Sequence, residues 1–359
     1  MKILLVTSLP AGGPLEHSLI LARALGAAGA EVEAVCAAEA TAARFEAAGA
    51  RAHVLALRHL ADAVGGARLE RLARRFDVVH GQDRRSGLWT RVWPRRGGPL
   101  RVYTVHGLPN PYLPVQAGGS GEPGLRDRLA YRGLDAALAR RSDAVVVPSR
   151  FLRDELVGRL GFPAERLTVI PNGVEPLPAQ EPGALVGTIS VLEPVKGLDT
   201  FVRAAAAVVA QRPGTRFAIF GEGSSRPGLE ALAREQGLAA AIEFPGHVPA
   251  PQALSRLGLY VLCSWLENAP ISLLEAMSAG VPAVATGVGG VPEIAADTVP
   301  LLAPGDEAAL AGAILATLED PAAAAAAAGR ARQRVLSEFS AERNASSLLA
   351  LYERLQSER

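Results

Sequence analysis

Short apolar runs alternate along this chain with longer stretches of helical pattern. The runs are rich in β-branched residues, which is typical of buried strands in parallel α/β sheets. Both halves of the chain repeat one plan of strand followed by helix. Strands are predicted at 3–7, 31–37, 77–80, 101–105, 144–148 and 168–170, and again at 185–189, 216–220, 242–244, 259–262 and 282–285.

The chain, at 359 residues, is too long for one typical core, so two domains are expected. Between the two sets of strands lies PNGVEPLPAQEPG, whose four prolines and lack of periodicity indicate a linker near 173–183. The sequence predicts an N-terminal domain at 1–175 and a C-terminal domain at 176–340. A last helix at about 341–357 follows a complete second domain, and we expect residues 341–359 to complete the first.

Composition excludes several classes of protein. Hydrophobic residues make up 49% and charged residues 20%, which argues against disorder. No run of about 18 uncharged apolar residues appears, and the apolar run from Ile3 to Val6 is too short for a signal peptide. Cys36 and Cys263 lie far apart without metal-ligand spacing, so a reducing cytoplasm is expected.

Charge is distributed unevenly between the halves. Residues 1–180 hold 24 Lys and Arg against 17 Asp and Glu, whereas the remainder holds 13 against 19. A basic half can attract an anionic substrate or an anionic membrane surface, although scattered arginines are also typical of solvated helix faces. Only Lys2 and Lys196 are lysines.

Candidate residues of the first half follow its predicted strands. Gly12 and Gly13 precede a helix, where backbone amides can bind phosphate, although such a pair is also a common simple turn. His80 and His106 end strands, and the carboxyl ends of strands are where open α/β sheets bind ligands. We interpret His80 and His17 as structural. His106 becomes a functional candidate only with the resemblance described below.

In the second half, Lys196 stands after a strand and before a helix. A cation there can neutralise charge on a leaving phosphate, and its retention in a chain with two lysines favours this role over a surface one. Glu267 would lie just before a helix predicted at 271–279, with Glu275 about two turns away. One carboxylate could bind sugar hydroxyls and the other a ribose, but a capped surface helix would show the same spacing.

The surrounding pattern decides between these interpretations. ENAPISLLEAMSAGVPAVATGVGGVPEI resembles the retaining glycosyltransferases of family 4, whose GT-B fold has two Rossmann-like parallel-sheet domains facing a central cleft. The resemblance spans nearly the whole chain. Further segments occur in the family's order: GGPLEHSLILARAL, DVVHGQDRRSG, VYTVHGLP, AVVVPSRF, VIPNGV, EPVKGLDTF, FGEG and FPGHVP.

The resemblance implies a role for each matching position. His106, Lys196 and Glu267 would be catalytic, lying respectively beside the transferred sugar and acceptor, on the diphosphate and on sugar hydroxyls. Supporting residues at the cleft edge of the first domain would be Ser149 and Asn172. Neither a metal nor a cofactor is implied beyond the nucleotide sugar as co-substrate. The donor would further be bound by Gly12, Gly13, Gly221, Glu222, Gly223, Asn268, Ala269, Pro270, Ile271, Ser272 and Glu275.

Two departures from the family pattern bear on activity. Val191 stands where relatives commonly carry an arginine on the diphosphate, and losing such a bond could cost a few kcal/mol of transition-state stabilisation. Arg226 or Arg150 could substitute for it. Asn268 and Ala269 replace a commoner Gly-Phe, which is expected to alter the donor fit only.

The predicted reaction is transfer of a sugar from a nucleoside diphosphate sugar to a hydroxyl acceptor with retained configuration, in polysaccharide, glycolipid or other glycoconjugate synthesis. Two rivals stay open: a non-catalytic GT-B protein that binds a nucleotide or a partner, supported by Val191, and a sugar-nucleotide epimerase.

The acceptor itself stays open between a soluble carbohydrate and a lipid-linked one. Arginines between Arg68 and Arg101 and between Arg126 and Arg153 could hold the first domain on an anionic membrane. The segment PYLPVQAGGSGEPGLRDR is interpreted as a loop on the acceptor side. The protein is expected in the cytoplasm, either free or at the inner face of the membrane, and nucleic acid is not an expected partner.

Overall fold

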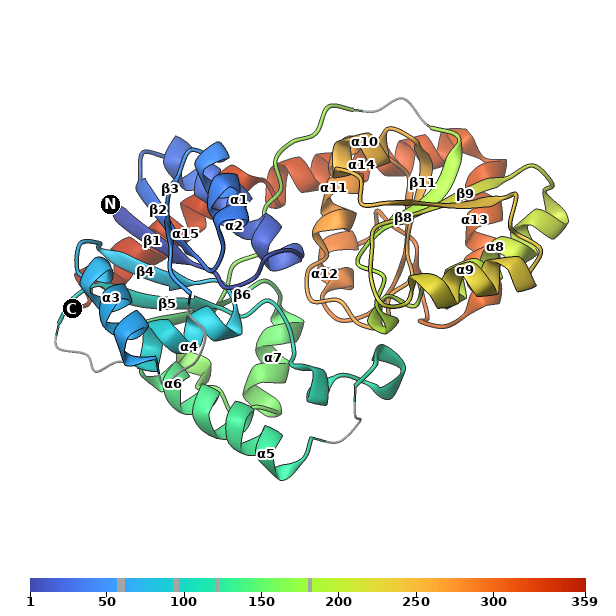
Figure 1. Ribbon diagram of the computed structural model, residues 1–359. Coiled ribbons are helices and arrows are strands. Elements are labelled where there is room, and N and C mark those ends of the chain that lie inside the picture. Colours follow the sequence, from blue (N-terminus) through green and yellow to red (C-terminus); the bar gives the residue numbers. More distant parts are fainter. Residues whose placement is uncertain (57–61, 93–96, 120–122, 180–182) are drawn as a thin grey trace. The chain divides into compact units, whose positions relative to one another are not determined.

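The computed structural model describes residues 1–56, 62–92, 97–119, 123–179 and 183–359. Residues 180–182 of the predicted linker, 120–122 of the predicted loop and 95–96 of the first arginine group lie outside this description. The chain forms two units (Figure 1). The first unit comprises Met1–Pro111, Glu122–Val174 and Ser340–Arg359, and the second comprises Tyr112–Gly121 and Glu175–Phe339.

In its described part, the first unit contains a parallel seven-stranded sheet. Chain order reverses between the neighbours β1 and β4, which makes their carboxyl ends a topological switch point. In spatial order the strands are β3 (Arg51–Val54), β2 (Glu31–Cys36), β1 (Lys2–Val6), β4 (Val78–Gly81), β5 (Leu100–Thr104), β6 (Ala144–Val147) and β7 (Leu167–Val169).

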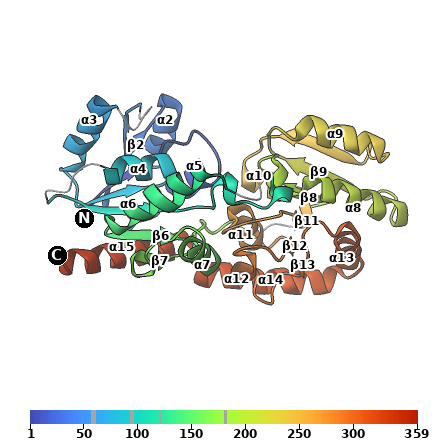
Figure 2. The same ribbon diagram turned by 90° about the horizontal axis from the view of Figure 1, so that it is seen from below.

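Helices cover both faces of this sheet, and Figure 2 shows α3 and α4 on one side with α15 on the other. The bounds are α1 (Gly13–Ala27), α2 (Glu39–Ala47), α3 (Ala63–Ala73), α4 (Arg84–Val92), α5 (Leu125–Asp127), the π-helix η3 (Arg128–Asp135), α6 (Ala136–Arg140), α7 (Arg150–Gly158) and α15 (Ala341–Ser357), with 3-10 turns η1 (Asn110–Tyr112) and η4 (Ala164–Arg166).

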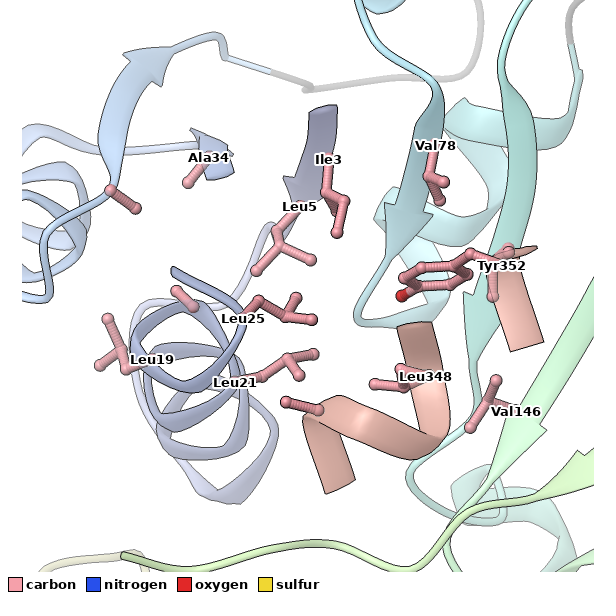
Figure 3. Packing of buried hydrophobic residues seen from close by; sticks show 14 of the residues in the cluster. Ile3, Leu5, Leu19, Leu21, Leu25, Ala34, Val78, Val146, Leu348 and Tyr352 are labelled. Atoms are coloured by element: carbon pink, nitrogen blue, oxygen red, sulfur yellow. The ribbon is translucent and has the colours of Figure 1, made fainter. Parts of the chain in front are cut away.

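Side chains along β1 alternate between the two faces of the sheet, which explains why helices pack on both faces. Ile3 and Leu5 pack with α1 and with Leu348 and Tyr352 of α15 (Figure 3), whereas the intervening residue Leu4 packs against α3 and α4. The last helix of the chain therefore belongs to the core of the first unit.

The second unit repeats the plan with a parallel six-stranded sheet in its described residues: β10 (Ile242–Gly246), β9 (Arg216–Phe220), β8 (Leu185–Ile189), β11 (Leu257–Leu262), β12 (Ala283–Thr286) and β13 (Leu301–Leu302). Its switch point lies between β8 and β11. Its helices are α8 (Leu198–Gln211), α9 (Arg226–Glu235), α10 (Ala250–Leu254), α11 (Ile271–Ala279), α12 (Val291–Ala295), α13 (Glu307–Glu319) and α14 (Pro321–Glu338), with 3-10 turns η2 (Val115–Ala117) and η5 (Pro194–Lys196).

The predicted class of two Rossmann-like parallel-sheet domains is confirmed, with each predicted strand found to within two residues. Two short edge strands, β3 and β13, were not predicted. One assignment differs: the sequence placed residues 112–121 in the first domain, but they group with the second unit. The left-handed turn at Gly118 brings this segment against Pro194, where a Cβ on Gly118 would lie 3.5 Å from the Pro194 Cβ.

No single helix in the described ranges is long and apolar enough to cross a bilayer. The pair α13 and α14 would pass by length and composition together, but it bends by 103° at its junction.

Candidate functional site

The switch point of the second unit brings together two loops that lie far apart in sequence. One follows β8 and contains Lys196, and the other follows β11 and contains Glu267. The Trp265 amide donates to the Val195 carbonyl at 2.8 Å. Gly197, with φ +59°, allows this approach because a Cβ there would overlap the Cys263 carbonyl oxygen.

Lys196 and Glu267 form an ion pair at the centre of this region. The Lys196 Nζ lies 2.6 Å from the Glu267 Oε1, and the Ser264 hydroxyl donates to the same oxygen at 2.7 Å. The two charged side chains are 19% and 10% exposed. The Gly290 amide donates to the Glu267 carbonyl at 2.9 Å, so the backbone of Glu267 is held as well as its carboxylate. Two of the predicted catalytic residues are thus in direct contact.

The residues after Glu267 lead into α11, which begins at Ile271 as predicted. No side chain caps this helix, whose N-cap is Pro270. The Asn268 Oδ1 is buried and has no hydrogen-bond partner in the described structure. The free amides at an uncapped helix start can donate to a negatively charged group of a ligand. An unsatisfied buried oxygen beside them is a hydrogen-bond acceptor that the described structure leaves unpaired.

Further along the helix, Ser272 bonds to the buried Tyr260 hydroxyl at 2.8 Å. Burial raises the pKa of Tyr260, and the nearby carboxylates of Glu267 and Glu275 raise it further. Both predicted sugar- and ribose-binding carboxylates therefore lie within electrostatic reach of one tyrosine.

Glycines at the end of β9 hold the loop after β8. A Cβ on Gly221, with φ +128°, would overlap the Ser190 carbonyl, and one on Gly223 would overlap that of Leu192. The Leu192 amide donates to the Glu222 carbonyl at 2.9 Å. The structure thus shows a packing reason for these glycines, and the Ser190 hydroxyl beside them is buried without a partner among the described residues.

Val191 and the proposed substitute arginines can also be placed. Val191 is 50% exposed on the loop after β8. The Arg226 guanidinium is held by Glu222 at 2.6 Å, by Glu230 at 2.8 Å and by the Phe244 carbonyl at 2.8 Å. Arg150 belongs to the first unit.

In the first unit, a pocket of about 780 Å³ lies at the carboxyl ends of β1, β4 and β5. Its polar lining residues are Ser8, Asp83, Arg84, Arg85, Tyr103 and His106, and its apolar ones include Pro14, Leu88 and Trp89. The Asp83 carboxylate accepts from the Ser8 amide at 2.5 Å and from the Ser86 amide at 3.0 Å, which fixes the loop after β1 to the start of α4. Asp83, Arg84 and Arg85 were not singled out from the sequence, although their place just after a strand was the available signal.

The two glycines at the start of α1 differ in their backbone requirements. Gly12 is the N-cap with φ +97°, a conformation that favours glycine, whereas a Cβ on Gly13 would meet nothing within 4 Å. The backbone at Gly13 therefore has open space beside it, and its contact with the donor stays a prediction.

Three histidines lie together beneath the pocket. The ring centroids of His17 and His106 are 5.0 Å apart, and His80 bonds to the Tyr352 hydroxyl and the Thr104 hydroxyl, each at 2.7 Å. Burial lowers the pKa of His80 and of His106 to about 3, and also lowers that of His17. The imidazoles are therefore neutral at pH 7.

These contacts give the three histidines different roles. His80 is structural, as interpreted from the sequence, because both its nitrogens are satisfied. His106 lines the pocket, and its buried Nε2 has no hydrogen-bond partner in the described chain. His17 contacts His106 edge-on, a contact that sequence reasoning missed.

The two predicted supporting residues, Ser149 and Asn172, both belong to the first unit. The Ser149 hydroxyl accepts from the Leu152 amide at 3.2 Å and caps α7. Asn172 is buried next to Gly173, which packs closely on Ser340 and the start of α15.

Two family models match this chain in sequence. The model of glycosyl transferases group 1 matches residues 172–334, and that of Glycosyltransferase Family 4 matches residues 11–176. A D-inositol 3-phosphate glycosyltransferase of Mycobacterium avium is 30% identical over 305 residues, covering 78% of this chain and 70% of the relative. The chain belongs to glycosyltransferase family 4. This identification confirms the resemblance seen in the motifs.

Other relatives match over shorter stretches of the chain. A glycogen synthase of Mycobacterium tuberculosis is 33% identical over 61% of this chain and 56% of its own length, and a 2-deoxystreptamine glucosyltransferase of Streptomyces kanamyceticus is 29% identical over 60% and 62%. The chain thus spans little more than half the length of these relatives. The fold is similar to that of Anabaena HepE in complex with UDP-glucose, with a TM-score of 0.84, 21% identity and coverage of 99% of this chain and 100% of the other.

The described residues contain no group of three or more His, Cys, Asp or Glu that could hold a metal ion.

Proposed function

We propose that this glycosyltransferase moves a sugar from a nucleoside diphosphate sugar to a hydroxyl acceptor with retention of configuration and without a metal. The observation that carries the proposal is the contact of Lys196 with Glu267 at the β8/β11 switch point, beside the uncapped start of α11. A solved neighbour of the same fold holds UDP-glucose, which supports this class of donor.

The second unit would bind the donor. Lys196 would leave Glu267 to bind the diphosphate, and the freed Glu267 carboxylate would accept hydrogen bonds from sugar hydroxyls. The amides from Asn268 to Ser272 would add to this site, and Glu275 would bind the ribose. Ligand binding thus replaces one partner of each charged group by another.

The first unit would bind the acceptor, and His106 would bond to the transferred sugar or the acceptor as a neutral imidazole. In the reaction, the bond from the anomeric carbon to the diphosphate oxygen breaks and a bond to the acceptor oxygen forms on the same face. The acceptor proton goes to the leaving phosphate. The protein contributes positioning and electrostatic stabilisation of the departing diphosphate.

The test is a thermal-shift screen of UDP, GDP, ADP and TDP and their sugars, followed by incubation with the sugars that bind. We expect one base to be preferred, and slow hydrolysis or transfer of its sugar with the product anomer matching the donor. An inverted product would contradict retention. Nucleotide binding without turnover would instead identify a non-catalytic binding protein, which is the alternative that Val191 suggested.

The names of the relatives differ in the acceptor, so family membership leaves it open. We propose a hydroxyl on a carbohydrate or a lipid-linked glycan, made available at an anionic membrane. The helix formed by α5, η3 and α6 supports this contact: Leu125 and Leu129 are 74% and 63% exposed, and Arg126, Arg128 and Arg132 are exposed among them. Exposed leucines one turn apart between arginines fit an anionic lipid surface.

Flotation with liposomes tests this contact. Binding is expected to vesicles containing anionic lipid, to weaken as salt rises, and to be lost on replacing both Leu125 and Leu129 by serine. Val64→Ser is the matched control, because Val64 is 64% exposed on α3. Equal binding to neutral vesicles, or none to anionic ones, would refute the membrane contact.

A further inference from the structure

Two arginines line the pocket of the first unit, and a third is buried against its lining residue Tyr103. Arg84 and Arg85 line it at the start of α4, whose positive dipole end faces the same space. Arg91, two turns further along α4, lies with its guanidinium carbon 4.0 Å from the ring centroid of Tyr103, and Tyr103 itself lines the pocket. The positive charge is thus gathered on one wall.

The charge of Arg91 is poorly compensated. Its side chain is among the largest fully buried ones, and its Nε donates to the Gly87 carbonyl at 2.6 Å. Neither terminal nitrogen has a hydrogen-bond partner among the residues that the structure describes. Burial lowers the pKa of Arg91, with Tyr103 and Asp135 opposing the shift. A buried cation without a full set of partners projects its positive potential into the neighbouring pocket, because the interior screens it weakly.

Arg84 is held in a fixed orientation. Its Nε donates to the Asp135 Oδ2 at 2.7 Å, and its guanidinium carbon lies 4.3 Å from the ring centroid of Tyr131. Both partners belong to η3, a π-helical stretch, and such stretches occur frequently at functional sites. The other oxygen of Asp135, Oδ1, is buried without a partner in the described residues. Because the stack and the bond lie on one side, the remaining guanidinium nitrogens of Arg84 can meet a ligand as far as the described residues are concerned.

Arg85 supplies the uncommitted charge. It is exposed and lines the pocket, and it has no acidic partner within the described ranges. The two carboxylates nearby are already engaged, Asp83 by amides and hydroxyls of its neighbours and Asp135 by Arg84. Three guanidiniums and two carboxylates leave this wall with a net charge of +1, and the neutral histidines add nothing to it.

We propose that this pocket takes an acceptor carrying a phosphate or carboxylate group, and that Arg84 and Arg85 bind that group. The inference rests on the glycosyltransferase function proposed above and names the class of its acceptor. The apolar wall of Pro14, Leu88 and Trp89 would contact the carbon skeleton of the same molecule. A guanidinium pair gives a neutral sugar no comparable gain, because an uncharged hydroxyl forms weaker bonds to arginine than an anionic oxygen does.

Calorimetric titration of the whole protein tests the pocket directly, with glucose, glucose 6-phosphate, glucuronate and inorganic phosphate as probes. We expect the anionic sugars to bind at least tenfold more tightly than glucose, with the difference shrinking as salt is raised. Arg85→Gln should remove at least tenfold of this affinity. Arg75→Gln is the matched control, since Arg75 is an exposed arginine just before β4, at the amino ends of the strands and away from the pocket.

Equal affinity for glucose and its anionic derivatives would overturn the proposal. So would an anion preference that survives Arg85→Gln, or one that Arg75→Gln removes equally. Nucleotide-sugar binding by the unaltered protein is measured alongside, in the second unit. If nucleotides bind and anions do not, only the acceptor class is wrong, whereas anion binding without any nucleotide binding would contradict the proposed transferase function.

Discussion

Replacing Lys196 by alanine perturbs both the structure and the proposed reaction. The change removes the ammonium that lies 2.6 Å from the Glu267 Oε1 and leaves that carboxylate with the Ser264 hydroxyl at 2.7 Å. Removing one partner of a fully buried ion pair costs about 3–5 kcal/mol. Here both side chains keep some exposure and Ser264 continues to donate, so we expect a loss of about 1–2 kcal/mol of unfolding free energy. For a domain of this size, that lowers Tm by about 2–8 °C.

The effect on activity is expected to be larger than the effect on stability. A charged donor aimed at a leaving phosphate contributes about 3–4 kcal/mol in the transition state, which corresponds to a 10²- to 10³-fold loss of kcat. Turnover is followed as nucleoside diphosphate release from the donor that the thermal-shift screen identifies. Affinity for that diphosphate is measured in the same preparation by calorimetry and should fall as well.

Lys2→Ala is the matched control, because Lys2 is the other lysine of the chain. It pairs with Glu31 at 2.9 Å, but both side chains are more than half exposed, so stability should change by less than about 0.5 kcal/mol and turnover should not change. The reasoning is refuted if Lys196→Ala releases diphosphate within a few-fold of the unaltered protein. A Tm loss without a loss of turnover would leave Lys196 as a structural residue only.

Two further outcomes are expected. In chemical denaturation, Gly197→Ala should lower the free energy of unfolding by more than Gly214→Ala does. Both glycines have a positive φ, but of the two only Gly197 packs against another loop. Equal losses of about 1 kcal/mol in the two variants would contradict this. The free energy of unfolding should also fall as the pH drops below about 6.5 toward 3. His80 and His106 have depressed pKa values in the folded protein, so the unfolded chain takes up protons that the native one does not. The slope is up to about 1.4 kcal/mol per pH unit for each histidine, and coinciding unfolding curves at pH 7, 6 and 5 would refute this prediction.

Much of the fold could be predicted because parallel strands buried on both faces leave continuous apolar runs. The start of α11 at Ile271 was predicted correctly, since Pro270 and the apolar periodicity after it mark a helix start. The edge strand β3 was missed because RAHV is partly exposed and lacks such a run. Residues 112–121 were assigned to the wrong domain because their contact with Pro194 depends on a tertiary turn at Gly118, which no local pattern reveals.

The candidate site likewise has parts that could be predicted from the sequence and parts that could not. Lys196 was predicted from its place after a strand and Glu267 from its place before a helix, but their pairing depends on β8 and β11 being neighbours at a switch point. The basic character of the first half was predicted, but the gathering of Arg84, Arg85 and Arg91 at the first pocket was not. Arg84 is oriented by Asp135, which is 51 residues away in sequence, and Arg91 stacks on Tyr103. Neither contact can be read from the local sequence.

If the second unit binds a diphosphate as proposed, the cations near Glu267 decide how its charge is met. Val191 offers no charge, and Arg226 is held by Glu222 and Glu230, so that this trio carries a net charge of −1. Lys196 is the cation in contact with the predicted sugar-binding carboxylate, and a diphosphate has to compete with Glu267 for it. The uncapped start of α11 favours the diphosphate in this competition, because its dipole adds positive potential without carrying a counter-charge. The reaction proposed here should therefore depend on Lys196 more strongly than in relatives that keep the arginine.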